Sequence, residues 1–238
     1  MIFNIFYAIY FVIVMVSLSI FIMIIYPFFM IFRAKKAWEK FFTYFVSLWA
    51  RLEIAGTGTK VTVKGIEKLP ESNVVFISNH QGYFDIPLIL GYTRRLVGFI
   101  AKIELKKIPL LSFWMKRIHC VFIDRKNLRK ANEYIDEGVK NLLNGYNMLI
   151  FPEGTRSKSN KTLPFKVGSF KLALRSSVPI VPLTIKNTYK MLEETGKIKK
   201  ANVELIIHDP VYPQTYSEID KNELVKKVEE TIKKPLEE

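Results

Sequence analysis

The sequence predicts an α/β protein with a mixed, largely parallel sheet flanked by helices, preceded by an N-terminal hydrophobic two-helix membrane motif. Three observations support this class. The first 32 residues contain no Asp, Glu, Lys, Arg or His, β-type and helical runs alternate beyond Leu52, and two of the β-type runs end in polar clusters. We therefore expect a membrane-attached motif over residues 1–52 and an α/β domain over residues 53–238.

The uncharged N-terminal stretch is poorly soluble in water, so it must meet lipid or a partner. As a single helix it would be ~48 Å long at ~1.5 Å per residue, well beyond the ~30 Å hydrocarbon core of a bilayer. Pro27 lacks a backbone donor, so we expect a first helix near Phe3 to Ile25 and a second helix after a break. A secretory signal is disfavoured because a basic start and a small-residue cleavage pattern are missing.

The second helix is expected to be amphipathic. Its apolar residues recur at helical spacing: Trp38, Phe41, Phe42, Phe45, Leu48 and Trp49. This pattern predicts a helix in the headgroup plane, although a helix packed on the protein's own core has the same pattern. Arg33, Lys35 and Lys36 directly follow the apolar run, and by the positive-inside rule they predict that the rest of the chain lies on the cytoplasmic face. We expect the membrane to be the cell membrane.

The rest of the chain is strongly basic. All 36 Lys and Arg and all 22 Asp and Glu lie from Arg33 onward, which gives a net charge of +14. Such a surplus attracts nucleic acid, anionic lipid surfaces or phosphorylated substrates, and the apolar start favours membrane lipids. RNA binding requires aromatic residues interleaved with basic ones on an exposed sheet, whereas the aromatic residues here concentrate in the first fifty positions. We therefore expect no nucleic-acid partner.

The α/β domain is expected to contain seven strands joined by helices, without internal repeats. The strands are expected at Val61 to Val63, Asn73 to Ser78, Leu96 to Ile100, His119 to Ile123, Met148 to Phe151, Ile180 to Ile185 and Val203 to Ile207. The helices are expected at Pro87 to Gly91, Glu104 to Met115 with an interruption at Pro109, Asn127 to Leu143, Lys166 to Ser176 and Glu218 to Lys233.

The first polar cluster, Asn79 to Asp85, follows the strand that ends at Ser78. In open α/β sheets the ligand crevice commonly lies beyond such strand ends. A His needs a second group on its far nitrogen to fix its tautomer, and a carboxylate five residues later can fold back across a turn to supply one. His80 and Asp85 are therefore candidate catalytic residues.

The second cluster, Glu153-Gly154-Thr155-Arg156-Ser157, has the composition of an anion site. Gly154 lets backbone amides approach an anion, Thr155 and Ser157 add hydroxyl donors, and Arg156 offers a two-pronged donor that matches phosphate oxygens. A carboxylate beside a phosphate is unfavourable unless Glu153 holds Arg156 in position or bonds a substrate hydroxyl. The alternative interpretation is a polar turn between elements.

Five sequence blocks, in this order, resemble those of the glycerolipid acyltransferase family, most closely the bacterial 1-acyl-sn-glycerol-3-phosphate acyltransferases. The resemblance covers roughly residues 66–210, and the blocks are His80 to Asp85, Phe99 to Leu105, Val121 to Arg125, Glu153 to Ser157 and Val178 to Leu183. Gly82 departs from the family pattern, where Ser is common.

The resemblance implies transfer of a fatty-acyl group from acyl-carrier protein or acyl-coenzyme A to the sn-2 hydroxyl of 1-acyl-sn-glycerol 3-phosphate (lysophosphatidate), giving phosphatidic acid in phospholipid biosynthesis. His80 would act as general base, with Asp85 holding its tautomer. Lys102, Arg125 and Arg156 are the candidates for the acceptor phosphate, and a solvated basic face is the alternative for them. The resemblance to the bacterial members also favours insertion of the two-helix motif in one leaflet over a first helix that spans the bilayer.

No cofactor is expected, and no metal, because His119 and His208 lack a ligand-spaced His or Cys partner. Cys120, the single cysteine, is expected to be a buried packing residue and not a nucleophile. Phe113, Trp114 and Met115 either line an apolar slot for the donor's chain or pack the core. The competing functions are an acyltransferase for another lysolipid and a non-catalytic module that binds anionic lipids, although the latter gives no role to His80 and Asp85.

Overall fold

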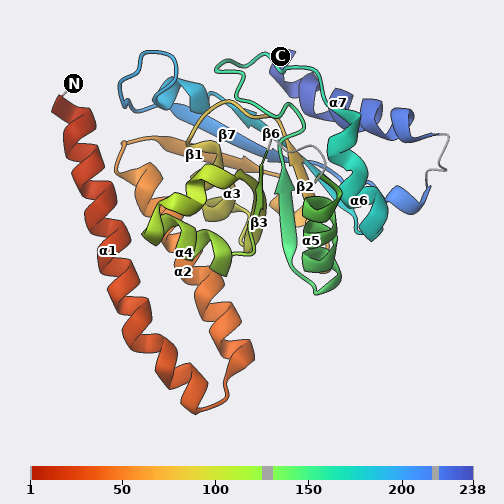
Figure 1. The fold of residues 1–238 in the computed structure, drawn as a ribbon. Coiled ribbons are helices and arrows are strands. Elements are labelled where there is room, and N and C mark those ends of the chain that lie inside the picture. Colours follow the sequence, from red (N-terminus) through yellow and green to blue (C-terminus); the bar gives the residue numbers. More distant parts are fainter. Residues whose placement is uncertain (1, 125–130, 216–219, 238) are drawn as a thin grey trace.

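The computed structural model describes residues 2–124, 131–215 and 220–237, in which a helical hairpin stands beside an α/β domain (Figure 1). The α-helices are α1 (Ile2–Ile31), α2 (Lys35–Ala55), α3 (Asp85–Tyr92), α4 (Pro109–Arg117), α5 (Ala131–Leu143), α6 (Lys171–Ser176) and α7 (Lys221–Glu237). The strands are β1 (Lys60–Lys64), β2 (Val75–Ser78), β3 (Val97–Lys102), β4 (Val121–Ile123), β5 (Asn147–Ile150), β6 (Ile180–Lys186) and β7 (Asn202–Ile207).

Helix α1 continues through Pro27, so the predicted break at that residue is wrong. A proline inside a helix costs about 3 kcal/mol, but Tyr26 and Phe29 on either side of it pack against Trp38 of α2, with ring centres 4.9 and 5.5 Å apart. The helix ends instead at a left-handed Arg33, whose φ is 52°. The N–H of Ala34 reaches back to the carbonyl of Phe29 at 2.9 Å, which closes the helix end.

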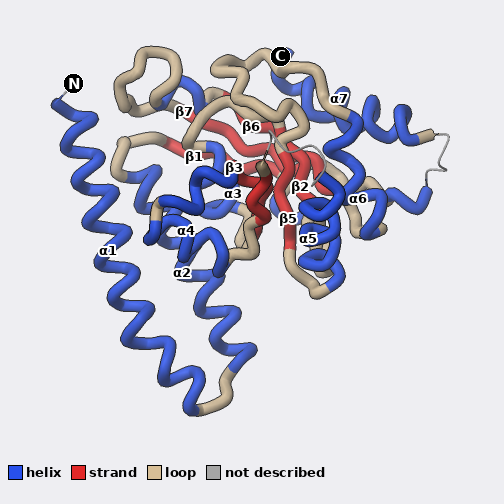
Figure 2. Tube along the Cα trace, viewed as in Figure 1, coloured by secondary structure: helices blue, strands red, loops and turns tan. Residues whose placement is uncertain are grey.

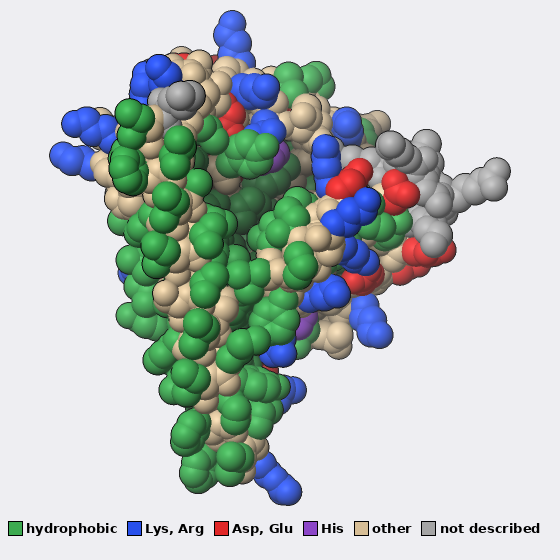
Figure 3. Space-filling model, turned by 60° about the vertical axis from the view of Figure 1, so that its left-hand side comes forward, with side chains coloured by type: hydrophobic (Ala, Val, Ile, Leu, Met, Phe, Trp, Pro, Cys, Tyr) green, Lys and Arg blue, Asp and Glu red, His purple; other side chains and the backbone are tan. Residues whose placement is uncertain are grey.

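Most of the surface of α1 is exposed and apolar, and hydrophobic side chains run along its whole length (Figure 3). Only Met15, Ser19 and Ile22 of this helix are buried. Within the described residues, α1 is the one helix long and apolar enough to cross a membrane, with a mean hydropathy of 2.9 over its best 18-residue window. An apolar face of this kind requires lipid or a partner to cover it.

Helix α2 packs its apolar face on the protein's own core, so the expectation that this face lies in the headgroup plane is wrong. Phe42 and Phe45 are 4% and 5% exposed within the main hydrophobic core. Ser47 and Arg51 donate hydrogen bonds to the carbonyl of Gly91, at 2.8 and 2.7 Å, which fasten α2 to the end of α3. The division expected at residue 52 falls inside α2.

In the described part of the chain the strands form one seven-stranded sheet in the order β1-β7-β6-β2-β5-β3-β4 (Figure 2). The β6–β7 pair is antiparallel and the other five pairs are parallel. This is the mixed, largely parallel sheet that the sequence predicts. Helices α2, α3 and α4 cover one face and α5, α6 and α7 cover the other. Side chains alternate between the two layers, so Phe76 of β2 packs in the first and Val75 and Ile77 pack in the second.

Element boundaries differ from the expected ones by a few residues. The interruption at Pro109 is confirmed, because a short 3-10 helix over Ile103–Lys107 precedes α4, which begins at the proline. Strand β4 begins at Val121 because His119, with φ at 64°, leaves the extended region. The predicted first turn of α5, residues 127–130, and residues 218 and 219 before α7 lie outside the described residues.

Candidate active site

Parallel pairing of β2 with β5 brings the two polar clusters together. Ile77 pairs with Ile150, so the residues three positions further on, His80 and Glu153, leave the sheet side by side. The two segments stay in contact, because the N–H of Ser157 donates to the carbonyl of His80 at 2.7 Å. The two clusters that the sequence singles out therefore form one site at the carboxyl edge of the sheet.

His80 and Asp85 are in direct contact. The Nδ1 atom of His80 lies 2.7 Å from Oδ2 of Asp85, which is fully buried at the start of α3. Because an ionised carboxylate only accepts hydrogen bonds, this contact assigns the proton to Nδ1 and leaves the lone pair on Nε2 for a substrate. The side chain of His80 is 19% exposed and lines a cavity.

Asp85 is fixed by three further hydrogen bonds. Its Oδ2 accepts the backbone N–H groups of Gln81 and Gly82, at 2.6 and 3.0 Å, and its Oδ1 accepts the hydroxyl of Thr188. Gln81 in turn accepts the N–H of Thr188 at 3.0 Å. The segment after β6 therefore helps to hold the carboxylate, a contribution that the sequence did not indicate.

Glu153 braces the backbone around His80. Its Oε1 accepts the N–H of His80 at 2.7 Å and its Oε2 accepts the N–H of Leu163 at 2.9 Å. Burial is the main cause that raises the pKa of Glu153 above its ordinary value, and these two N–H groups offset part of the rise. Phe151 stacks on the imidazole of His80, with ring centres 3.9 Å apart and an angle of 12° between the planes.

Arg156 is held by Glu193 and not by Glu153. Its Nη1 lies 3.1 Å from Oε1 of Glu193, and its guanidinium carbon lies 3.7 Å from the centre of the Tyr83 ring. The side chain of Arg156 is 28% exposed, whereas that of Glu193 is 3% exposed. Tyr83 lies within the first polar cluster, although the sequence indicated no role for it, and Glu193 belongs to neither cluster.

Of the other predicted site residues, Thr155 and Ser157 lie on the loop that carries Arg156. Thr155 is exposed, and the Ser157 hydroxyl is turned into its own loop, where it donates to the carbonyl of Ser159 at 2.9 Å. Lys102 is exposed at the end of β3. Arg125 lies outside the described residues. The phosphate-binding roles expected for these residues stay predictions.

A cavity of about 450 Å³ opens beside His80 and Phe151. Lys166 is the one Lys or Arg among the described residues that line it, and it approaches the backbone so closely that a Cβ on Gly154 would meet its Nζ at 2.8 Å. Gly154 also adopts a φ of +72°, which favours glycine. The sequence suggested only a helix start at Lys166. The remaining lining residues are Ile100, Ile123, Asp124, Tyr134, Ile135, Ile150, Gly168, Ser169 and Leu172.

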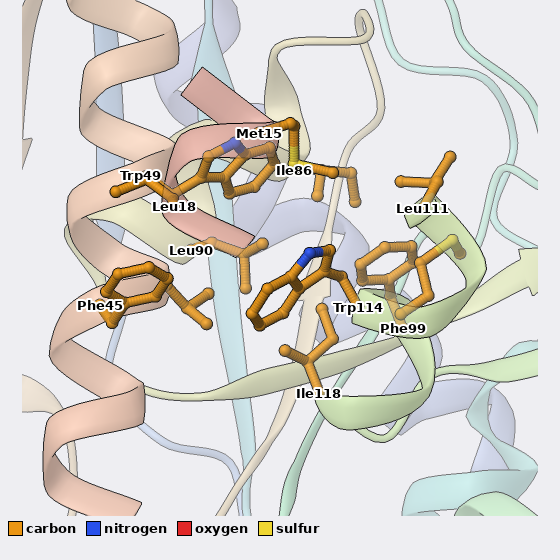
Figure 4. Close-up of a pocket in the computed structure, with 12 residues that line it drawn as sticks. Met15, Leu18, Phe45, Trp49, Ile86, Leu90, Phe99, Leu111, Trp114 and Ile118 are labelled. Carbon is orange, nitrogen blue, oxygen red and sulfur yellow. The ribbon is translucent and has the colours of Figure 1, made fainter. Parts of the chain in front are cut away.

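A second, entirely apolar cavity of about 100 Å³ lies between the helical hairpin and the α/β domain (Figure 4). Met15 and Leu18 of α1 and Trp49 of α2 line it from the hairpin side, and Trp114 and Ile118 from the domain side. Met115 lines it as well, whereas Phe113 does not. Phe113, Trp114 and Met115 were expected either to line a slot or to pack the core. Trp114 and Met115 do both, because they line this cavity and also pack in the main core.

Three other residues have side chains capable of chemistry, and all three are at least partly buried: Cys120, His119 and His208. Cys120 is buried, and burial raises the pKa of its thiol far above the ordinary value. Burial lowers the pKa of both His119 and His208, and the latter to about 4. His208 bonds Thr184 at 2.8 Å between β6 and β7. Within the described residues, no group of three or more His, Cys, Asp and Glu could hold a metal ion.

Residues 60–186 match the model of the Acyltransferase family. A probable 1-acyl-sn-glycerol-3-phosphate acyltransferase of Mycoplasma pneumoniae is 37% identical over 185 residues, which cover 72% of this chain and 69% of that protein. The chloroplastic 1-acyl-sn-glycerol-3-phosphate acyltransferase BAT2 of Brassica napus is 32% identical, over 79% of this chain and 54% of its own length.

A solved structure has the same fold over nearly the full length of both chains. The crystal structure of the 1-acyl-sn-glycerophosphate (LPA) acyltransferase PlsC from Thermotoga maritima superposes with a TM-score of 0.78 at 31% sequence identity. The match covers 97% of this chain and 96% of that one, so it includes the helical hairpin as well as the sheet.

Proposed function

This chain belongs to the acyltransferase family, and from that premise we propose that it acylates the sn-2 hydroxyl of 1-acyl-sn-glycerol 3-phosphate to give phosphatidic acid in phospholipid biosynthesis. The observation that carries the proposal is the contact of 2.7 Å between His80 and a fully buried Asp85 at the edge of a cavity. A positioned imidazole whose Nε2 bonds no described residue is the group that deprotonation of a hydroxyl requires.

In the proposed reaction the acceptor hydroxyl attacks the carbonyl carbon of an acyl thioester while Nε2 of His80 takes the hydroxyl proton. The tetrahedral intermediate collapses by breaking the C–S bond, and the imidazolium returns the proton to the leaving thiolate. Ester and free thiol are the products. Asp85 holds the imidazole in the required tautomer and stabilises its charged form. No acyl-enzyme is needed, which agrees with the burial of Cys120.

Acceptor recognition is assigned to the basic residues that surround this centre. Arg156 presents a partly exposed guanidinium whose planar donors match the oxygens of a phosphomonoester. Lys102, at the end of β3, and Arg125 are proposed to add positive charge for the acceptor phosphate. Glu153, Gly154, Thr155 and Ser157 shape the loop that carries Arg156. The apolar cavity against α1 is proposed to receive part of an acyl chain.

The protein is proposed to act at the cytoplasmic face of the cell membrane, with α1 inserted in one leaflet. The exposed apolar side chains along α1 support attachment to lipid. Arg33, Lys35 and Lys36 at the turn of the hairpin can meet anionic headgroups. The donor is an acyl thioester of acyl-carrier protein or of coenzyme A, and both carry the same reacting group.

A matrix of donors and acceptors tests this function. Purified full-length protein in lipid–detergent micelles is given each thioester with lysophosphatidate or with lysophosphatidylcholine, and thiol release and acylated product are measured. We expect phosphatidate with lysophosphatidate and little product with lysophosphatidylcholine, whose phosphodiester carries less charge. Preferred acylation of lysophosphatidylcholine would show that the acceptor is another lysolipid. No thiol release with any pair would favour the non-catalytic lipid-binding alternative.

A further inference from the structure

We propose that Glu193 is a positioning residue for Arg156, and that this buried carboxylate sets how tightly the acceptor's phosphate is bound. The inference rests on the proposed function. Glu193 lies 37 positions beyond Arg156 along the chain and belongs to none of the sequence clusters. It reaches the site because β6 pairs with β2, which carries the segment after β6 to the loop that contains His80.

Glu193, Arg156 and Tyr83 each contact the other two, and we call this set of contacts the Arg156 clamp. Oε1 of Glu193 accepts both the Nη1 donor of Arg156, at 3.1 Å, and the backbone N–H of Tyr83, at 2.7 Å. The guanidinium carbon lies over the Tyr83 ring, 3.7 Å from its centre. Arg156 is therefore held at one nitrogen and over one ring, while no acceptor among the described residues takes up its remaining N–H donors.

Gly82 explains how the carboxylate fits. A Cβ at this position would lie 2.4 Å from Oε2 of Glu193, closer than any side chain tolerates without movement. The φ of Gly82 is not in the left-handed region, so the close approach of Glu193 and not the backbone conformation accounts for glycine here. The N–H of the same residue bonds Asp85 at 3.0 Å, so Gly82 connects the His80–Asp85 pair to the Arg156 clamp.

The clamp leaves one oxygen of the carboxylate unsatisfied. Oε2 of Glu193 is buried, and among the described residues no donor reaches it. A buried acceptor in this state is costly, and it persists only if the other contacts of the group compensate for it. The contacts that do so are those of Oε1, which fix Arg156. Because an arginine that is already ordered loses less conformational freedom when it binds phosphate, the clamp should strengthen acceptor binding.

Kinetics of Glu193 variants test the proposal against a purely structural role. Glu193→Ala should raise the KM for lysophosphatidate by about tenfold, while kcat and the KM for the thioester change by less than about twofold. Glu193→Gln should lie between, because its amide oxygen can still accept from Tyr83 and Arg156 without the charge. In the Arg156→Ala background, Glu193→Ala should add no further rise, because the carboxylate acts through the guanidinium.

Gly82→Ala supplies an independent perturbation of the same clamp. The added methyl group displaces the carboxylate, so we expect a higher acceptor KM in the wild-type background. In the Glu193→Ala background the methyl group meets empty space, so the same change should raise the acceptor KM no further. Any effect through the N–H bond to Asp85 would appear in kcat and in both backgrounds alike, which separates it from the effect on the clamp.

Results that contradict these expectations would show which is wrong, the positioning role of Glu193 or the proposed function. Equal increases in both KM values, or an effect of Glu193→Ala that persists without Arg156, would show a merely structural role. A lower acceptor KM in Glu193→Ala would show that the carboxylate competes with the phosphate, and this too would overturn the proposal. If Glu193→Ala does not fold, Glu193→Gln decides by the same criteria. A wild-type protein that forms no product from lysophosphatidate would overturn the proposed function itself.

Discussion

The position of the candidate base depends on Asp85, because the two oxygens of this carboxylate serve different parts of the chain. Oδ2 meets His80 and the backbone of the turn after β2, and Oδ1 meets Thr188 on the segment after β6. Replacing the carboxylate by an amide removes its negative charge and leaves a single oxygen to accept these hydrogen bonds. The imidazolium that forms during the reaction would then lose the charge that stabilises it.

Asp85→Asn is therefore expected to lower kcat about 100-fold or more while changing the KM values little. Thr188→Val is the matched control, because it removes a single hydrogen bond to the same carboxylate and should cost at most about tenfold. Steady-state kinetics, with thermal unfolding as a check of folding, measure both. An Asp85→Asn enzyme with near-normal kcat would show that the carboxylate does not support the base.

Arg156→Ala is expected to raise the KM for lysophosphatidate by about 10- to 100-fold, since a charge-assisted hydrogen bond contributes ~1.5 to 3 kcal/mol. The KM for the thioester should hardly change. Arg156→Lys should rescue only part of the loss, because a point charge lacks the two-pronged geometry and the stacking on Tyr83. A variant impaired only towards the thioester would move Arg156 to the donor site.

Contacts between side chains can be predicted from the sequence where they are local. His80 and Asp85 are five positions apart, so one turn brings them together. Thr188 lies 103 positions from Asp85 and reaches it only through the pairing of β2 with β6. Of the two roles considered for Glu153, holding Arg156 is not what the structure shows, because the folded chain brings Glu193 to Arg156 instead.

At the scale of elements, a buried carboxylate links α1 to α2. Glu53 of α2 is 1% exposed, and the hydroxyl of Tyr7 on α1 donates to its Oε2 at 3.0 Å. Burial is the main cause that raises the pKa of Glu53 to about 7, and the hydrogen bond from Tyr7 offsets part of the rise. The folded protein therefore holds this proton more tightly than the unfolded chain does.

This raised pKa predicts that stability depends on pH through Glu53. The stabilising contribution is complete below the ordinary pKa of 4.5 and is lost as the pH rises through about 7. The difference corresponds to a change on the order of 3 kcal/mol in the free energy of unfolding. Glu53→Gln should remove it, so thermal unfolding in detergent at pH 5 and pH 8 should differ less in the variant. Equal pH dependence in both proteins would contradict the assignment.

The elements themselves were largely predictable. Short apolar runs predicted the strands, and the lack of a backbone N–H at Pro109 predicted the break before α4. Pro27 shows the limit of that rule, because aromatic packing of Tyr26 and Phe29 on Trp38 keeps α1 continuous. The face of α2 was ambiguous for a physical reason: burial in a core and burial in a headgroup layer select the same side chains.

At the scale of the whole molecule, the hairpin divides its surfaces between lipid and protein. Helix α2 fastens to α3 and the core, whereas α1 buries few side chains and exposes the rest. A contact of 2.7 Å from the Trp114 indole to Ser19 is one of the few polar links between α1 and the domain. Removal of both helices would expose the core, so attachment is best tested by removing α1 alone.

Deletion of residues 1–33 is expected to abolish flotation with liposomes and to reduce turnover on lipid-embedded acceptor far more than turnover on dispersed acceptor. The apolar side chains of α1 supply the lipid contact that the deletion removes. Full-length His80→Ala, which retains α1, is the control and should float like wild type. Unchanged flotation of the deleted protein would show that the basic face provides the anchor.

Phosphatidate formation by His80→Ala, compared with wild type in the same preparation, tests the central claim most directly. Product and thiol are followed with lysophosphatidate and an acyl thioester at saturating concentrations. Wild type should form both in equal amounts, and His80→Ala should be slower by about 10²- to 10⁴-fold with its fold and liposome binding intact. Near-normal turnover by His80→Ala would contradict the assignment of His80 as the base.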